Sequence, residues 1–283
     1  MKKITFLILG DLHGSMPKFH TQNFDAIICP GDICGDDIRT AFYSHKDEIS
    51  DEGGVSDDMD WDEISLQKGR KVLEYLNSLN KPVFLVPGNW DHTPYRDGMG
   101  PYILDPEINP WEKIKVGLEN IYDVEYTKAE FEGIAIVGHG STSSPEPLEL
   151  EEDTNEEELD SRELFFRHRF AELNTFMQEE SKPTILISHN APYGTKLDLI
   201  QNEKSYAHGE HYGSGLTRVL IDENQPLLCI SGHIHEGVGQ EVLGKTTCIN
   251  SGFKGDINVI VEIDVEQKKI IHVEFLGHSA DND

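Results

Sequence analysis

Long apolar runs are absent from this chain of 283 residues. No stretch approaches the ~20 apolar residues that a helix needs to cross a bilayer, so a membrane protein is not expected. The first apolar run, Ile4 to Leu9, is also too short for a signal peptide with its cleavage site. Removal of that run would delete the polar motif that follows it, so we expect no cleaved leader.

Cysteine is scarce as well, and its four residues form no C-x-x-C pair: Cys29, Cys34, Cys229 and Cys248. Two of them, Cys29 and Cys229, fall in apolar runs where a cysteine behaves as a small hydrophobic residue. The spacing of a zinc-binding or redox cysteine pair is therefore missing. The simplest compartment for such a chain is the cytoplasm.

Basic residues are few, with 24 Lys and Arg against 52 Asp and Glu, and the net charge is −28. A protein that binds duplex nucleic acid needs a cluster of basic side chains to neutralise phosphates, so such a partner is not expected. The acidic excess is concentrated at about 45–64 and 144–163. We interpret both stretches as solvated surface insertions; a role in protein binding or regulation and adaptation to high salt are the alternatives.

Neither an internal repeat nor a linker rich in Pro, Gly and Ser divides the chain. Its length suffices for a large α/β domain with a substantial core. The polar motifs described next run from residue 11 to residue 235, so one domain must close around them. We predict a single domain over residues 1–283.

The chain does contain short β-branched apolar runs, ITFLIL, DAIIC, PVFLV, TILI and PLLCI, each followed by polar side chains. Such runs predict buried strands, and the residues after them are expected at one edge of a sheet. Any one of these motifs is usually an ordinary turn, but five in this order indicate a polynuclear metal site. The candidate ligands are Asp11, His13, Asp32, Asn89, His189, His233 and His235.

In this order the motifs resemble the calcineurin-like metallophosphoesterase superfamily. Its pattern is Asp-x-His, Gly-Asp, Gly-Asn-His-Asp or -Glu, a single His, and Gly-His-x-His. The resemblance runs from about residue 3 to about residue 275, and the stretches 191–196 and 250–252 are similar to small stand-alone archaeal and bacterial phosphodiesterase-type members. It implies a phosphoester hydrolase with a four-layer α/β/β/α sandwich, two mixed sheets flanked by helices.

The resemblance also implies two divalent metal ions that share one carboxylate. The first ion would be bound by Asp11, His13, Asp32 and His235. The second would be bound by Asp32, Asn89, His189 and His233. This mixture of oxygen and nitrogen ligands suits Mn, which we favour, and also Fe, Zn or Ni. A hydroxide activated by two such ions would attack the phosphorus in line.

The chain departs from the family pattern at Trp90, where the family usually has a histidine that assists the leaving group. An indole has one N–H donor and no acid–base chemistry near neutral pH, so Trp90 is expected to contact substrate or to wall the pocket. Esters with good leaving groups suffer least from the loss of an acid. We therefore expect hydrolysis of small phosphodiesters and weak action on phosphomonoesters.

The remaining candidates lie close to the motifs. Asn89 is expected to reach phosphate through its amide nitrogen, and Asp91 matches the acidic residue of the family pattern. We group both with the catalytic residues, together with His92 and His139, either of which could replace the missing histidine. His211 is a candidate substrate contact. For each of these three histidines, the alternative is an ordinary structural or loop residue.

Periodicity predicts the remaining elements. Strands are predicted at 3–9, 25–30, 82–87, 184–188 and 227–231, and helices at 65–80, 161–179 and 213–221. A hairpin is predicted from 120–126 and 133–138, and antiparallel strands at 240–250, 258–264 and 269–275.

Two other functions remain open. The chain could act on phosphomonoesters or phosphoproteins, or it could be a non-catalytic metal-binding scaffold for protein–protein contacts, as the retromer trafficking subunit of this superfamily is. All seven ligand positions hold competent side chains, which favours an enzyme acting on a small phosphoester. The sequence does not determine the physiological substrate or whether the protein forms a homo-oligomer.

Overall fold

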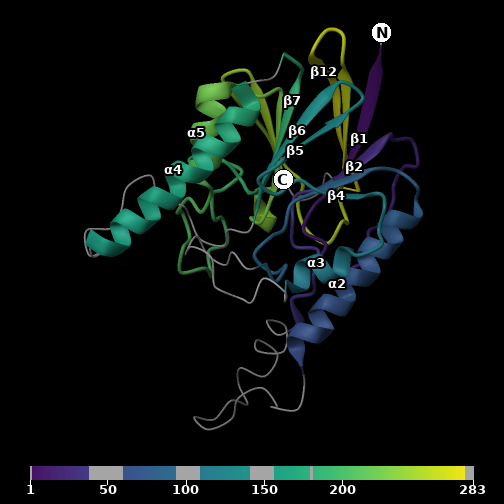
Figure 1. The fold of residues 1–283 in the computed structure, drawn as a ribbon, viewed down its shortest axis with the longest axis horizontal. Coiled ribbons are helices and arrows are strands. Elements are labelled where there is room, and N and C mark those ends of the chain that lie inside the picture. Colours follow the sequence, from purple (N-terminus) through teal and green to yellow (C-terminus); the bar gives the residue numbers. More distant parts are fainter. Residues whose placement is uncertain (1, 38–59, 94–108, 141–155, 179–180, 278–283) are drawn as a thin grey trace.

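The computed structural model describes residues 2–37, 60–93, 109–140, 156–178 and 181–277, with only the backbone described at 156–166. In this part of the chain, two six-stranded mixed sheets pack against each other and helices cover their outer faces (Figure 1). The predicted α/β/β/α sandwich is confirmed. No helix in the described ranges has the length and apolar character needed to cross a membrane.

The first sheet has the order β12-β11-β1-β2-β3-β4. Its strands are β1 (Lys3–Leu9), β2 (Ala26–Cys29), β3 (Val83–Leu85), β4 (Ile121–Asp123), β11 (Asn258–Asp264) and β12 (Lys269–Leu276). Strands β1 to β4 run parallel, whereas β11 pairs antiparallel with both β1 and β12.

The second sheet has the order β5-β6-β7-β8-β10-β9. Its strands are β5 (Lys128–Phe131), β6 (Ile134–His139), β7 (Thr184–Asn190), β8 (Leu228–Gly232), β9 (Gly239–Leu243) and β10 (Thr246–Asn250). Strands β6, β7, β8 and β10 run parallel, and an antiparallel strand closes each edge.

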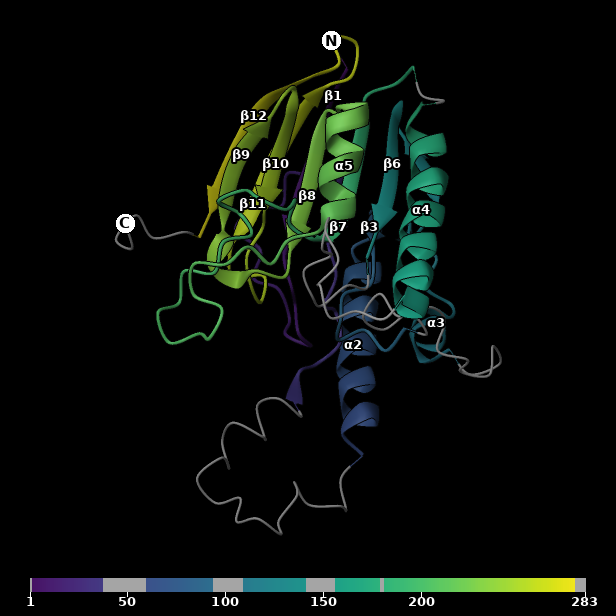
Figure 2. The same cartoon turned by 90° about the vertical axis from the view of Figure 1, so that its left-hand side faces the viewer.

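Alternation along each strand divides the core into layers, because successive side chains point to opposite faces of a sheet. In β1, Phe6 and Ile8 join the cluster between the two sheets, whereas Leu7 and Leu9 face the helices α2 (Trp61–Ser78) and α3 (Pro110–Lys115). The outer face of the second sheet is covered by α4 (Glu156–Gln178) and α5 (Gly215–Asn224), which lie side by side in Figure 2.

Three helix boundaries differ from the sequence prediction. Helix α2 begins at Trp61 rather than at residue 65, because the Asp60 carboxylate accepts the Glu63 N–H at 3.0 Å and caps the helix. Helix α4 begins at Glu156 rather than at 161, and α5 spans Gly215–Asn224 rather than 213–221. The acidic stretches therefore contribute helix residues, whereas 45–59 and 144–155 lie outside the described residues.

The predicted hairpin between 120–126 and 133–138 is wrong. The segment Ile121–Asp123 forms β4, which pairs parallel with β3 in the first sheet. Strand β6 instead forms a hairpin with β5 through Glu132 and Gly133, whose φ angles of 53° and 91° give the positive-φ pair that tight hairpins favour. The segment predicted as one strand at 240–250 is likewise split at Gly244 into β9 and β10.

Candidate metal centre

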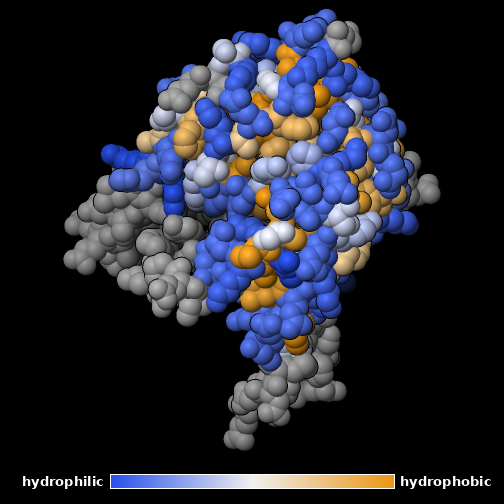
Figure 3. All heavy atoms as spheres, turned by 45° about the vertical axis from the view of Figure 1, so that its right-hand side comes forward, coloured by the Kyte–Doolittle hydropathy of each residue, from blue (hydrophilic) through white to orange (hydrophobic). Residues whose placement is uncertain are grey.

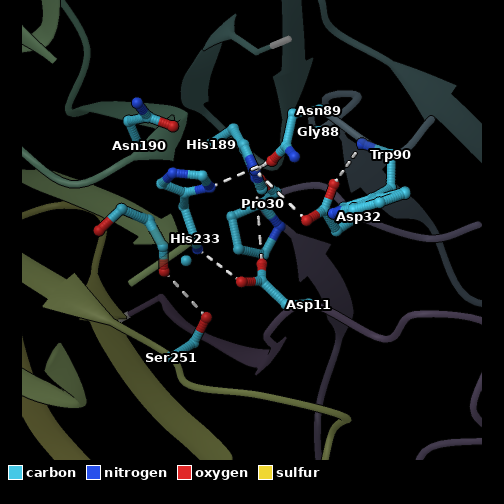
Figure 4. Close-up of polar contacts among 12 residues, drawn as sticks. Asp11, Pro30, Asp32, Gly88, Asn89, Trp90, His189, Asn190, His233 and Ser251 are labelled. Atoms are coloured by element: carbon cyan, nitrogen blue, oxygen red, sulfur yellow. Dashed lines mark hydrogen bonds and ion pairs between the residues drawn. The ribbon is translucent and has the colours of Figure 1, made fainter. Parts of the chain in front are cut away.

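The seven candidate ligands lie at the ends of five strands from both sheets. Asp11 and His13 follow β1, Asp32 follows β2, Asn89 follows β3, His189 lies near the end of β7, and His233 and His235 follow β8. A hydrogen bond links the two sheets here: the His233 N–H donates to Asp11 Oδ2 at 2.5 Å, although the two residues are 222 positions apart in the sequence. Figure 4 shows the side chains of Asp11, Asp32, Asn89, His189 and His233 directed toward one another.

Three of the side chains form a first cluster. Donor atoms of Asp11, His13 and His235 all lie within 4.8 Å of one another. His235 Nε2 is 3.4 Å from Asp11 Oδ2, and His13 Nε2 is 3.3 Å from Asp32 Oδ2. Asp32 therefore faces this cluster as well.

A second cluster contains Asp32, His189 and His233, with donor atoms again within 4.8 Å of one another. Asn89 Oδ1 joins it, at 2.9 Å from His189 Nε2 and 3.1 Å from His233 Nδ1. Because His189 Nε2 also lies 3.6 Å from Asp32 Oδ2, the Asp32 carboxylate stands between the two clusters.

The chemistry of these groups fits divalent cations. Asp11 Oδ1 and both ring nitrogens of His13 are buried and form no hydrogen bond with any described residue. Buried polar atoms without partners are costly, and cation binding would remove that cost. Carboxylate, imidazole and amide-oxygen donors suit first-row transition metals, so the two clusters are candidate sites for a dinuclear centre.

Burial also prepares the imidazoles for metal binding. It lowers the pKa of His13 to about 4 and that of His233 to about 3, so both rings are neutral at neutral pH, as metal ligands must be. Burial, reinforced by the charges of Asp11 and Asp91, raises the pKa of Asp32 well above its ordinary value. Cations bound in the two clusters would offset this crowding of carboxylates.

Backbone strain is concentrated at the same residues. Asp11, His13, Asp32 and His233 all have positive φ angles, of 25°, 44°, 51° and 63°. Left-handed conformations of non-glycine residues cost of order 1–3 kcal/mol each and persist where the surrounding structure imposes them. Each of these residues comes after the end of a strand, and its backbone conformation turns the side chain toward the clusters.

Glycines make room for the ligands. A Cβ at Gly88 would lie 2.2 Å from Asp32 Oδ1, one at Gly232 would lie 2.2 Å from Asp11 Oδ1, and one at Gly31 would lie 2.6 Å from His189 Nδ1. Each glycine directly precedes one candidate ligand and packs against another ligand from a different strand. The Gly-Asp, Gly-Asn and Gly-His pairs in the sequence are therefore a local sign of this close packing around the ligands.

Asp91 contacts backbone groups rather than the clusters. Its carboxylate is buried and accepts N–H bonds from Gly88 at 2.8 Å, Ile33 at 3.2 Å and Cys34 at 2.7 Å. These bonds join the loop after β2 to the loop after β3. Asp91 was predicted to be catalytic, but its contacts favour a role in holding the loops that carry Asp32 and Asn89.

The other predicted residues occupy different places. The Trp90 backbone N–H donates to Asp32 Oδ1 at 2.8 Å. His92 Nε2 lies 3.0 Å from Ser65 Oγ, so its ring faces α2, and His139 is buried with its ring 5.6 Å from that of Tyr126. The structure brings neither His92 nor His139 into the two clusters.

Sequence reasoning missed three supporting groups. The Pro30 carbonyl lies 3.0 Å from His189 Nδ1 and orients Nε2 toward the second cluster, as outer partners of ligating histidines do. The Phe253 ring stacks on His235 at 3.9 Å between centroids. Asp198 lies 2.8 Å from His211 Nδ1, and neither it nor Pro30 belongs to a recognisable motif.

Comparisons with known proteins agree with this geometry. Residues 4–237 match the family model for calcineurin-like phosphoesterases, whereas no curated protein matches the chain significantly. One crystal structure superposes with a TM-score of 0.60 at 17% identity, over 96% of this chain and 99% of the other. For TT1561 of Thermus thermophilus the TM-score is 0.53 at 15% identity, over 97% and 98% of the chains.

A putative 5′-nucleotidase from Staphylococcus aureus gives a TM-score of 0.50 at 12% identity, over 97% of this chain and 54% of that one. At these identities the superpositions establish the shared fold alone.

Proposed function

This chain belongs to the calcineurin-like phosphoesterase family, and from that premise we propose that it is a metal-dependent phosphodiesterase acting on small phosphodiesters. The observation that carries the proposal is the pair of clusters with Asp32 between them. All seven ligand positions of the family pattern hold competent donors, which supports an enzyme over a non-catalytic scaffold.

The proposed ligand assignment follows the two clusters. One ion would be held by Asp11, His13, Asp32 and His235, and the other by Asp32, Asn89, His189 and His233. Manganese is the proposed metal, and Fe, Zn or Ni suit the same donors. Such ions supply Lewis-acid chemistry, neutralising phosphoryl oxygens and lowering the pKa of water.

The side chains of this chain position the substrate. Because Asn89 Oδ1 faces His189 and His233, its amide nitrogen is left to donate to a phosphoryl oxygen. Asp91 would hold the loops that carry Asp32 and Asn89, while the Trp90 N–H fixes the Asp32 carboxylate. The side chains of Asp11 and His189 are fully buried, so bulk water does not reach them.

Preference for diesters rests on Trp90. An indole does not act as an acid near neutral pH, so Trp90 cannot protonate a departing oxygen. Leaving groups that depart without protonation are therefore favoured beside Trp90.

The net charge of −28 disfavours duplex nucleic acid as substrate, but screening beyond ~8 Å at physiological salt lets a small anionic ester approach. Four free, buried cysteines are consistent with the cytoplasmic location that we propose.

The test is hydrolysis of bis-p-nitrophenyl phosphate and p-nitrophenyl phosphate after chelation and after addition of Mn²⁺ or Ni²⁺. We expect turnover that needs the metal, favours the diester and is lost in Asp32→Asn. Asp222→Asn, on the exposed side of α5, is the matched control and should retain activity. Faster monoester cleavage would support the phosphomonoesterase alternative, and no cleavage with any metal would support the scaffold alternative.

A further inference from the structure

We propose that His211, held by the buried carboxylate of Asp198, is the proton donor to the leaving group. This inference rests on the proposed phosphoesterase function and supplies a role that Trp90 cannot fill. It extends the expected substrates from activated esters to diesters whose leaving oxygen must be protonated as it departs.

The two side chains form a dyad with defined hydrogen-bond roles. Asp198 is fully buried, and its carboxylate accepts the N–H groups of Thr195 at 2.7 Å, Gly213 at 3.0 Å and Gly194 at 3.1 Å. His211 Nδ1 lies 2.8 Å from Asp198 Oδ1. A carboxylate held by these donors acts as an acceptor, so Nδ1 carries the hydrogen and Nε2 is the nitrogen that can exchange a proton with substrate.

Backbone hydrogen bonds hold the segment of the dyad that carries His211 beside the segment that follows His189. The Ser214 N–H donates to the Ala191 carbonyl at 2.8 Å, and the Tyr193 N–H donates to the Ser214 carbonyl at 3.1 Å. The segment that carries His211 therefore runs alongside the first residues after β7. Figure 2 shows this loop, in green, at the end of the second sheet where β7 and β8 finish.

Further bonds join the dyad to the segment that carries His233 and His235. The Asn250 side-chain amide donates to the carbonyl of Leu197, the neighbour of Asp198, at 3.2 Å and to that of Ile234 at 2.9 Å. Glu236 Oε1 accepts the N–H groups of Gln201 and Asn202, each at 3.1 Å. The segments that carry the dyad are thus joined to both ligand-bearing segments of the second sheet, and from these bonds we infer that the dyad lies beside the candidate centre.

Exposure separates His211 from the other two candidate histidines. Its side chain is 35% exposed, which lets Nε2 meet a substrate, whereas His139 is only 1% exposed. His92 directs its Nε2 to Ser65 of α2, and the Asp62 carboxylate, 3.8 Å from its Nδ1, is largely exposed. His211 combines a partly exposed ring with a fully buried carboxylate partner.

The proposed step balances with water as the only co-reactant. The oxygen of water forms a bond to phosphorus as the bond from phosphorus to the ester oxygen breaks. That ester oxygen keeps the bonding electron pair and takes the proton from His211 Nε2, leaving as a neutral alcohol or phenol. The attacking water loses a proton, and this proton restores the one that His211 Nε2 gave to the leaving oxygen. The phosphomonoester is then released.

The test compares kcat on diphenyl phosphate and bis-p-nitrophenyl phosphate, whose leaving groups differ in their need for a proton. His211→Asn retains an N–H donor for Asp198 but has no group to transfer the proton. We expect kcat on diphenyl phosphate to fall about 10²-fold or more, with a much smaller loss on the nitrophenyl ester and little change in KM. His208→Asn, in the exposed part of the same loop, should match the wild type on both esters.

A rescue variant distinguishes loss of the proton donor from a merely structural effect of His211→Asn. Adding Trp90→His to the His211→Asn variant returns a histidine to the position where the family pattern has one, and diphenyl phosphate turnover should recover. Equal losses on both esters, no loss on either, or wild-type protein that cleaves only the nitrophenyl ester would overturn the dyad while leaving the proposed function in place. Wild-type protein that cleaves neither ester would overturn both.

Discussion

At the scale of single residues, the candidate centre depends on glycines that pack against ligands from other strands. A methyl group at Gly232 would lie 2.2 Å from Asp11 Oδ1, so Gly232→Ala must displace the carboxylate or the loop. We expect its affinity for Mn²⁺, measured by titration calorimetry on chelated protein, to fall about 10–100-fold, as when groups supporting a ligand are removed. Gly117→Ala is the control for the backbone effect of an added methyl group, because its φ of 77° strains the local backbone while nothing lies within 4 Å of the methyl position; equal affinities would refute the steric argument.

Asp91 distinguishes a supporting residue from a catalytic one. The two carboxylate oxygens of Asp91 accept three backbone N–H bonds. An amide at this position would replace one of these oxygens by an N–H₂ group, which cannot accept from a backbone N–H. Asp91→Asn should therefore reduce the free energy of unfolding by about 1–3 kcal/mol, measured by urea denaturation. Unchanged stability together with a large fall in kcat would show instead that Asp91 takes part in the chemistry.

At the scale of elements, Glu125 lies between β4 and β5 as a half-buried residue whose two carboxylate oxygens are shielded from solvent. Burial, followed by the charge of Asp123, raises its pKa well above the ordinary value, against the opposing effects of the Gly140 N–H and the charge of Arg169. The folded state therefore holds the Glu125 proton more tightly than the unfolded state does. Its contribution to stability is complete below the unfolded pKa of about 4.3 and is lost as pH rises toward the folded pKa.

Glu125→Gln should remove this pH dependence. Between pH 5 and pH 8, the free energy of unfolding of the wild type should fall relative to that of the variant, so the variant gains its advantage at the higher pH. Urea denaturation at both pH values measures the difference, with Glu119→Gln, on the exposed surface, as the control. A difference between variant and wild type that stays constant with pH would contradict the assignment.

At the scale of the whole molecule, charge dominates the surface. Figure 3 shows a face covered mainly by hydrophilic residues, with scattered hydrophobic patches. A net charge of −28 makes the compact state repel itself, and salt screens this repulsion as the Debye length falls from ~30 Å at 0.01 M to ~8 Å at 0.15 M. We expect Tm to rise over this range with NaCl and equally with KCl; a flat or falling Tm would show that the charges are already balanced locally.

The fold class and the seven candidate ligands were predictable from the sequence for a local reason. Apolar runs of four to six residues mark buried strands, and parallel strands end at one edge, so the polar residues after them must meet there. Strand β1 and the position of Asp11 follow from this pattern alone. The hairpin was mispredicted because strand pairing is decided by distant residues: Ile121–Asp123 has no signal that assigns it to β3 rather than β6.

By itself, the sequence predicted which residues gather at the candidate metal centre, because residue type and strand-end position are local properties. Only the tertiary structure decided how those residues are supported. It places the Gly232 backbone against Asp11, directs the Asp91 carboxylate to three backbone N–H groups and sets His211 on a buried Asp198. These contacts join segments from different strands and loops, and packing of the two sheets sets their geometry, so no local pattern in the chain encodes them.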